Sequence, residues 1–280
     1  MFADNTVLTS NGVLYHGSFN AFGHRCDLQL ETSDQHVAEQ LLVSVSSEVN
    51  RISDKYDNDL TENIITQINR GTSESIIVDA ETAGLLDFSE VCYELSEGRF
   101  DVCCSAIQSD KKIPRLIKPK HWHQIRWDNP RLRLLQGMQL NVKAFTKAHA
   151  CDRAISLACE ISKVPMLLSI DRVHLSNKPR VSTGDWWLEH FKSTANNTAT
   201  SMQFQQGAIT TVYSKSRETG DSNYFDGRTN HPITENPAAI TVAAATCTEA
   251  NMLATLAMLY GEYAEQYLTT QQATFSIEPR

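Results

Sequence analysis

Lys147 is the residue whose type and position first suggest chemistry. It lies in the segment LNVKAFTKAHACD at 140–152, where Thr146 predicts the cap of a helix whose apolar side begins at Ala150 and Ala154. Lys147 would then lie in the first helical turn, where a cation and unpaired backbone amides point to the same place. This pattern indicates an anion site. The alternative is a solvated lysine at a helix end, since lysine is usually exposed.

Asn251 and Thr255 form a second candidate pair. Apolar residues between 250 and 257 predict a helix there, and residues four apart lie on one helical face. Both side chains carry an oxygen atom that can bind a ligand. The alternative is that both are polar residues on the surface of a helix beside a strand.

Other familiar chemistry has no support in the sequence. There is no GxSxG, GxxxxGK[ST], HExxH or GxGxxG motif. The seven cysteines are an odd number without CxxC or zinc-type spacing, which disfavours a disulfide scaffold or a zinc site. A formal net charge of -8 disfavours binding of nucleic acid, which needs a basic face.

The sequence also carries information about membrane insertion and cellular compartment. No stretch approaches the roughly 18 consecutive apolar residues that span a bilayer, so we expect no membrane span. The first residues, MFADNTVLTS, have neither a basic nor an apolar signal-peptide region. The compartment stays open: periplasmic if a leader was removed, and otherwise cytoplasmic.

Apolar periodicity predicts the elements that must position these residues. Near-alternating apolar residues over 13–30 predict a hairpin, and apolar residues at steps of four and three predict a helix over 37–52. Asp79 is a predicted N-cap of a helix that ends before Gly98. Short apolar runs between prolines predict hairpin strands within 110–139, and further strands are expected at 166–170, 202–213 and 238–246.

Strands and helices that do not alternate regularly indicate an α+β fold with mixed sheets and packed helices. We predict one domain over 13–270, subdivided near 136–140. The N-terminal half would be 13–139 and the C-terminal half 140–280.

Six segments, taken together and in order, carry a resemblance to a known family. They are AFGH at 21, SEGRFDV at 96, LNVKAFTKAHACD at 140, GAITT at 207, SNYFDGRTNHPI at 222 and ITVAAATCTEANMLAT at 240. They resemble, from about Tyr15 to Leu268, the signatures of the ApbE-type FAD:protein FMN transferases. The resemblance implies a T-fold-like α+β architecture, binding of FAD with a magnesium ion on its pyrophosphate, and transfer of FMN to a threonine of a partner protein.

The same resemblance implies roles for individual residues. The metal would be held by the backbone carbonyl of Ala144 and by the side chains of Asn251 and Thr255. Asp226 is the candidate catalytic residue, although a turn and an ion pair with Arg228 explain its type better. The implied cofactor-binding residues are Phe22, Arg99, Phe100, Asp101, Asn141, Lys147, Thr211 and Tyr224.

Several family positions are substituted in this chain. Asn251 stands where the family has aspartate, and Asn223 where it has a histidine that could take a proton. Asp59 replaces a flavin-stacking tyrosine. The glycines of the family's helix-start and strand-end motifs are replaced by Lys143, Ala144 and Ala148, and by Asp171 and Arg172.

These substitutions predict an impaired FMN transferase. Removal of a catalytic base commonly costs on the order of 10² to 10⁴ in rate, and loss of a charged ligand weakens metal binding as well. His24, His149 and His231 lie in or beside the matched segments and are candidates to compensate. The alternative function is that of a pseudoenzyme: a non-catalytic relative that binds a flavin nucleotide or a partner protein.

Overall fold

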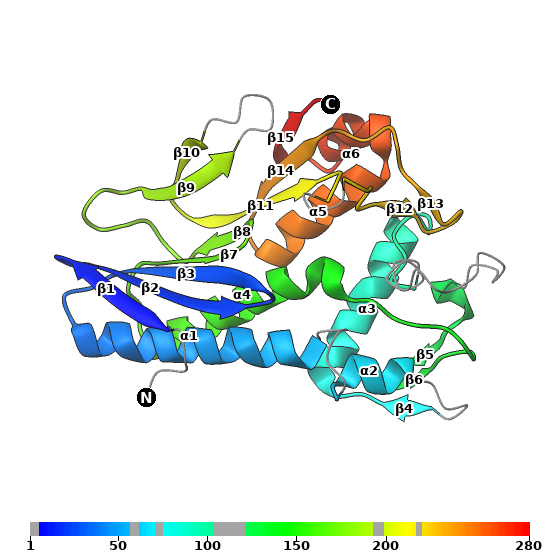
Figure 1. Ribbon diagram of the computed structural model, residues 1–280, viewed down its shortest axis with the longest axis horizontal. Helices are drawn as coiled ribbons and strands as arrows, with labels where there is room; N and C mark the ends of the chain where they lie inside the picture. The colour runs from blue at the N-terminus through cyan, green and yellow to red at the C-terminus, as the bar shows by residue number, and fades with distance from the viewer. Residues whose placement is uncertain (1–5, 57–61, 71–74, 104–120, 193–198, 217–219) are drawn as a thin grey trace.

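The structure is a computed structural model that describes residues 6–56, 62–70, 75–103, 121–192, 199–216 and 220–280. A large sheet and a layer of long helices make up most of the molecule, and a smaller helical and hairpin region lies at one end (Figure 1). The predicted α+β class is confirmed. No helix among the described residues is long and apolar enough to cross a membrane.

The large sheet has eight strands, and every neighbouring pair is antiparallel. Its strand order is β1-β2-β3-β7-β8-β11-β14-β15. The bounds are β1 Val7–Asn11, β2 Leu14–Ala21, β3 His24–Glu31, β7 Met166–Ile170, β8 Val173–Ser176, β11 Gly207–Tyr213, β14 Ala239–Ala244 and β15 Thr274–Glu278.

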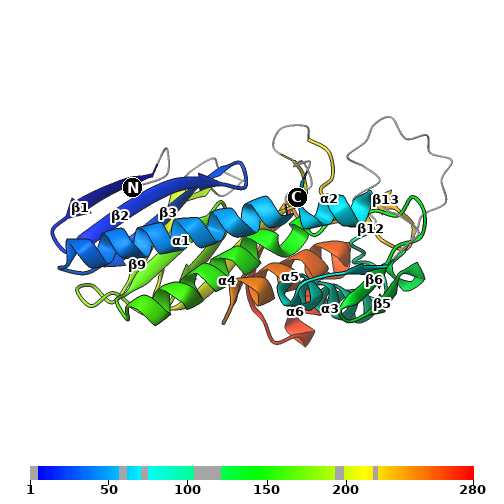
Figure 2. The same cartoon turned by 90° about the horizontal axis from the view of Figure 1, so that it is seen from below.

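Three helices cover one side of this sheet, as Figure 2 shows from below: α1 Gln35–Tyr56, α4 Lys143–Ile161 and α5 Cys247–Leu259. The apolar stripe of α1 is fully buried at Leu41, Val45 and Val49, which confirms the predicted amphipathic helix. On β3 the alternate residues Cys26, Leu28 and Leu30 are buried, as the period of two requires.

The remaining elements lie around this frame, and α3 is the longest of them. Asp79 caps α3 by accepting a hydrogen bond from the amide of Thr82 at 3.0 Å, so that prediction is also confirmed. The elements are α2 Ile64–Asn69, α3 Ala80–Leu95, α6 Ala264–Thr270, the 3₁₀ turns Trp122–Gln124 and Gly261–Tyr263, the small sheet of β4 Ile76–Ile77, β5 Arg126–Asp128 and β6 Arg131–Arg133, and the pairs β9 Trp186–Lys192 with β10 Ala199–Phe204 and β12 Phe225–Asp226 with β13 His231–Pro232.

Some predictions fall partly outside the described residues. The hairpin strands expected within 110–139 correspond to β5 and β6, whereas 104–120 lies outside the described ranges. Asp59 lies outside them too. The predicted subdivision near 136–140 stays a prediction, and one apolar cluster contains Phe100 before it and Phe145 after it, with ring centroids 6.4 Å apart.

Helix α4 starts earlier than the sequence predicts. It begins at Lys143 after Val142, not after Thr146, so the predicted Thr146 cap is wrong. Thr146 is instead 2% exposed within the first turns of the helix. The local signal is Asn141, whose side-chain oxygen accepts a hydrogen bond from the amide of Lys143 at 3.0 Å.

Two glycine-to-alanine changes should have opposite effects on stability. A Cβ at Gly17 of β2 would lie 2.6 Å from Cδ1 of Leu42, a fully buried side chain of α1. Gly17→Ala should therefore lower the free energy of unfolding by about 1–3 kcal/mol. Gly84, in α3, has no atom within 4 Å of such a Cβ, so Gly84→Ala should raise it by roughly 0.5–1 kcal/mol.

Urea unfolding of both variants measures these changes. Replacing Leu42 by alanine should remove most of the Gly17→Ala penalty in the double variant. Equal effects of the two glycine changes would contradict the packing of β2 on α1.

Candidate functional site

The site begins where α5 crosses the first turn of α4. Nδ2 of Asn251 lies 2.6 Å from the backbone oxygen of Ala144, and Asn251 is 8% exposed. A carbonyl oxygen only accepts hydrogen bonds, so this contact fixes the orientation of the amide, with the NH₂ group toward Ala144. The predicted metal ligands Asn251 and Ala144 are therefore bonded directly to each other.

Thr255 follows Asn251 by one turn of α5 and is 6% exposed. Its hydroxyl hydrogen-bonds the phenol of Tyr224, which comes from the loop before β12. Burial raises the pKa of Tyr224, and the bond to Thr255 offsets only part of this effect. The Tyr224 hydroxyl thus stays protonated at neutral pH, beside Thr255.

These three groups do not fit a magnesium ion as they are arranged. The Ala144 carbonyl accepts from an amide, the Asn251 side chain is uncharged, and the Thr255 hydroxyl is bonded to Tyr224. Magnesium prefers charged oxygen ligands in near-octahedral geometry. Within the described ranges, no group of three or more His, Cys, Asp and Glu side chains could hold a metal ion.

Lys147 lies one turn further along α4 than Ala144, and it does not lie at the helix N-terminus. It is the fifth residue of α4, so the predicted anion site formed with the first-turn amides is wrong. Its Nζ lies 3.0 Å from Oδ2 of Asp171, and Nε2 of His24 lies 3.8 Å from the same oxygen. Burial works to raise the pKa of Asp171, but Lys147 holds it below its usual value.

Arg172 follows Asp171 and stacks on a tyrosine. Its guanidinium carbon lies 4.0 Å from the ring centroid of Tyr213 on β11. Thr211 donates its backbone N–H to the carbonyl of Arg172 at 3.2 Å. The Thr211 hydroxyl lies 2.9 Å from that of Thr241 and is buried, so this predicted cofactor-binding side chain is bonded within the sheet.

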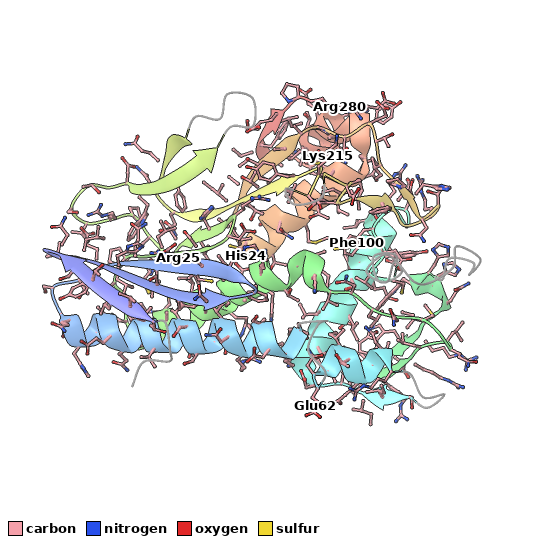
Figure 3. The ribbon with its side chains drawn as sticks, viewed as in Figure 1. His24, Arg25, Glu62, Phe100, Lys215 and Arg280 are labelled. Atoms are coloured by element: carbon pink, nitrogen blue, oxygen red, sulfur yellow. The ribbon has the colours of Figure 1, made fainter. Side chains whose placement is uncertain are left out.

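Phe22 and His24 bring the tip of the β2–β3 hairpin to this region; His24 is labelled in Figure 3. Phe22 has a φ of 53° and donates its backbone N–H to Oγ of Ser53 at 3.1 Å. Its ring is partly buried against the core. The hairpin tip is therefore fixed to α1 on one side and lies near Asp171 on the other.

A second group of predicted residues lies in the segment after α3. Phe100, labelled in Figure 3, packs on Phe145 and is 6% exposed, which makes it a core residue. Asp101 accepts hydrogen bonds from the amides of Cys103 at 2.8 Å and Trp122 at 3.1 Å. Burial raises the pKa of Asp101 in spite of these bonds. The backbone N–H of Asn141 donates a hydrogen bond to the carbonyl of Val102 at 2.8 Å.

The loop that contains Asp226 is docked on this segment. Gly227 donates its N–H to the carbonyl of Arg99 at 2.8 Å, and Arg99 itself lies 4.5 Å over the ring of Tyr260. Asp226 forms a two-pronged ion pair with Arg228. Burial works to raise the pKa of Asp226, but Arg228 lowers it below its usual value. This geometry is that of a loop-fixing carboxylate.

The structure thus gathers the predicted residues into two adjoining groups. The first group consists of helix and sheet residues near the Asn251–Ala144 hydrogen bond. The second group lies around the loop that contains Asp226, which docks on Arg99. Tyr224 belongs to the first group, and Asp226, two residues later, belongs to the second. The first group holds Phe22, Ala144, Lys147, Thr211, Tyr224, Asn251 and Thr255, and the second holds Arg99, Phe100, Asp101, Asn141 and Asp226.

Sequence reasoning missed how the substituted residues are used. Asp171 and Arg172 stand out in the sequence only as replacements of glycines, and Tyr213 is not singled out by its pattern. The signal that could have found them is the two-residue turn between two apolar strands, which places both charges at one end of the sheet.

Comparison with known proteins identifies the class. The model of the ApbE family matches residues 22–276, and the chain belongs to this family. Similar solved structures are the ApbE protein from Thermotoga maritima, with TM-score 0.79 and 18% identity over 94% of each chain, and the apo flavinyl transferase ApbE from Pseudomonas stutzeri, with TM-score 0.81 and 14% identity over 100% of this chain and 93% of that one.

A third similar structure is the flavin transferase ApbE from Vibrio cholerae, with TM-score 0.77 and 14% identity over 97% of this chain and 93% of that one. No curated protein sequence matches significantly. The predicted ApbE-like architecture is confirmed.

Asn251→Asp should create a dependence on divalent cations. A carboxylate oxygen beside the Ala144 carbonyl loses the hydrogen bond and adds repulsion, so the metal-free variant should lose roughly 1–3 kcal/mol of stability. Millimolar magnesium should restore the loss, because a cation bridges two oxygens. The measurement is the melting temperature in EDTA and in magnesium.

Asn251→Ala is the matched control for this variant. It also loses the bond to Ala144 but supplies no charge, so magnesium should leave its melting temperature unchanged. A magnesium-induced rise in the wild-type protein would contradict the assignment of a metal-free arrangement.

Gly227→Ala should undock the loop over 222–233. The new Cβ would lie 2.5 Å from the carbonyl oxygen of Gly98 and 2.8 Å from Cβ of Asp101. We expect about 1–3 kcal/mol of destabilisation and faster proteolysis within this loop. An unchanged urea midpoint and unchanged cleavage would show that the loop does not depend on this close approach.

Proposed function

We propose that this protein binds FAD beside α4 and α5 without a magnesium ion, and that its transfer of FMN to a threonine of a partner protein is impaired. The observation that carries this proposal is the 2.6 Å hydrogen bond from the Asn251 amide to the Ala144 carbonyl. Membership of the ApbE family supports the flavin nucleotide as ligand. The names of the similar solved structures, two of them flavin transferases, support the reaction class.

The hydrogen bond supports loss of the metal for a direct reason. The family resemblance implies an aspartate facing this carbonyl, and a carboxylate oxygen and a carbonyl oxygen repel each other unless a cation binds both. An amide needs none, because its N–H supplies the positive end of a dipole. The substitution therefore stabilises the metal-free arrangement of α4 and α5.

The residues expected to move protons support an impaired reaction. Asn223, at the position of the family histidine, donates its side-chain amide to the carbonyl of Tyr213 at 2.9 Å and has no basic nitrogen. Asp226 is paired with Arg228. Of the histidines considered as substitutes, His149 lies 3.1 Å from Glu81 at the start of α3. A general base for the threonine hydroxyl would therefore have to come from elsewhere.

A magnesium-dependent transferase is the second candidate function. It is favoured by the convergence of Ala144, Thr255 and Tyr224 on one place, together with family membership. This function requires the Asn251 side chain to rotate, so that its oxygen faces a metal ion and its hydrogen bond to the Ala144 carbonyl is broken. A third possibility is a relative that binds only a partner protein.

FAD titration distinguishes these functions. We expect quenching of flavin fluorescence with the same dissociation constant, within about twofold, in EDTA and in millimolar magnesium, because no charged ligand for magnesium faces Ala144. Binding that requires magnesium would favour the second candidate. Absence of FAD binding in both conditions would leave the partner-binding relative.

Transfer is tested on a threonine-containing acceptor protein, with the flavin transferase ApbE from Vibrio cholerae as the positive control. In-gel flavin fluorescence should appear with the control enzyme and be at least about 10²-fold slower with this protein. Comparable rates would overturn the impairment. Asn251→Asp is the informative variant, since recovery of magnesium-dependent transfer would trace the defect to this residue.

A further inference from the structure

The turn between β7 and β8 places two charged side chains at one end of the sheet. Asp171 and Arg172 are its two residues, and Ile170 pairs with Val173 across it. Asp171 has a φ of 56°, a left-handed conformation that costs an aspartate little more than an asparagine but favours glycine. Asp171 therefore occupies a position that favours glycine, and its contacts with neighbouring side chains suggest a reason for a carboxylate there.

The contacts gather cations around one carboxylate. Oδ2 of Asp171 lies 3.0 Å from Nζ of Lys147 and 3.8 Å from Nε2 of His24, and its Oδ1 lies 3.9 Å from Nε of Arg172. Two permanent positive charges and one ionisable imidazole therefore surround one negative charge. The side chains of Lys147, Arg172 and Asp171 are 29%, 28% and 27% exposed, so solutes can reach all three.

Arg172 connects this cluster to the residues around Asn251. Its guanidinium carbon lies 4.0 Å from the ring centroid of Tyr213, and its charge is near enough to the Tyr224 hydroxyl to lower that group's pKa against the dominant effect of burial. Tyr224 in turn bonds Thr255. The guanidinium therefore lies beside Asp171 and within electrostatic range of Tyr224.

We infer that Arg172, together with Lys147, binds the diphosphate of a dinucleotide directly and supplies the positive charge that a divalent cation would otherwise provide. This inference rests on the proposed metal-free binding of FAD. A guanidinium presents a planar fork of donors that suits phosphate oxygens, and stacking on Tyr213 orders that fork before the ligand arrives. The Lys147 ammonium adds a second charge from α4.

Asp171 then acts as an internal counter-ion. Its carboxylate neutralises Lys147 and Arg172 while no anion is bound, and a diphosphate competes with it for the same cations. Removal of this carboxylate should strengthen anion binding, whereas removal of the guanidinium should weaken it. A purely structural role of the turn predicts the same direction for both changes, so the two variants separate the explanations.

The test is a titration of FAD in EDTA with three variants. Arg172→Gln should raise the dissociation constant at least about tenfold, because it removes charge-assisted hydrogen bonds to phosphate. Asp171→Asn should lower it several-fold. Arg25→Gln is the matched control, since Arg25 also pairs with a neighbouring aspartate, Asp27, at 3.0 Å but on an exposed part of β3 (Figure 3); its dissociation constant should stay within about twofold.

Riboflavin and ADP identify the recognised group. Riboflavin has no phosphate, so its binding should not respond to Arg172→Gln, whereas ADP should respond as FAD does. Added salt should weaken FAD binding to the wild type more than to Arg172→Gln. If Arg172→Gln does not fold, the direction of the Asp171→Asn effect and the salt dependence decide.

Two failures are distinguishable. If the wild type binds FAD in EDTA but Arg172→Gln binds equally well, the inference about Arg172 is overturned and the proposed function stands. If the wild type binds FAD only with magnesium, the proposed function fails, and with it the replacement of the cation by Arg172. Weaker binding by Asp171→Asn would show that the turn is structural.

Discussion

The contact of α4 with α5 brings Asn251 and Thr255 to the first turn of α4, and its central interaction is the hydrogen bond from Asn251 to Ala144. A second contact fixes the same pair of helices, because the carboxylate of Asp152 accepts from the amides of Cys247 at 2.7 Å and Thr248 at 2.9 Å. The anchor points are about 12 Å apart along α4 and about 6 Å apart along α5. Later residues of α4 meet earlier residues of α5, so the helices run antiparallel.

This double anchorage holds the two helices together through hydrogen bonds alone. Asp152 already fills the N-terminus of α5, where an anion is favoured by the exposed amides. The position of α5 therefore does not depend on a bound ion at its other anchor. The second anchor is a neutral hydrogen bond, because the Asn251 side chain is uncharged and donates to the Ala144 carbonyl.

Local signals made much of the fold predictable. The α1 stripe, the β2–β3 hairpin, the Asp79 cap and the strand at 166–170 each follow from residues within one element. The start of α4 was not predictable in this way. Thr146 has a side chain typical of an N-cap but is buried within the helix, and the side chain that accepts a hydrogen bond at the start of α4 is that of Asn141. Lys147 was consequently expected at a helix terminus that lies four residues earlier.

The site was predictable as a set of segments but not as a set of contacts. Spacing placed Asn251 and Thr255 on one face, yet it could not show that the Ala144 carbonyl lies within 2.6 Å of that face, since this depends on helix packing. The ion pair of Lys147 with Asp171 joins residues 24 positions apart through the sheet. The positive charge of Lys147 is thus balanced by a carboxylate from a different element. Oδ1 of Asp171 also lies 3.9 Å from Nε of Arg172, so the β7–β8 turn places one carboxylate between a lysine of α4 and an arginine of the turn itself.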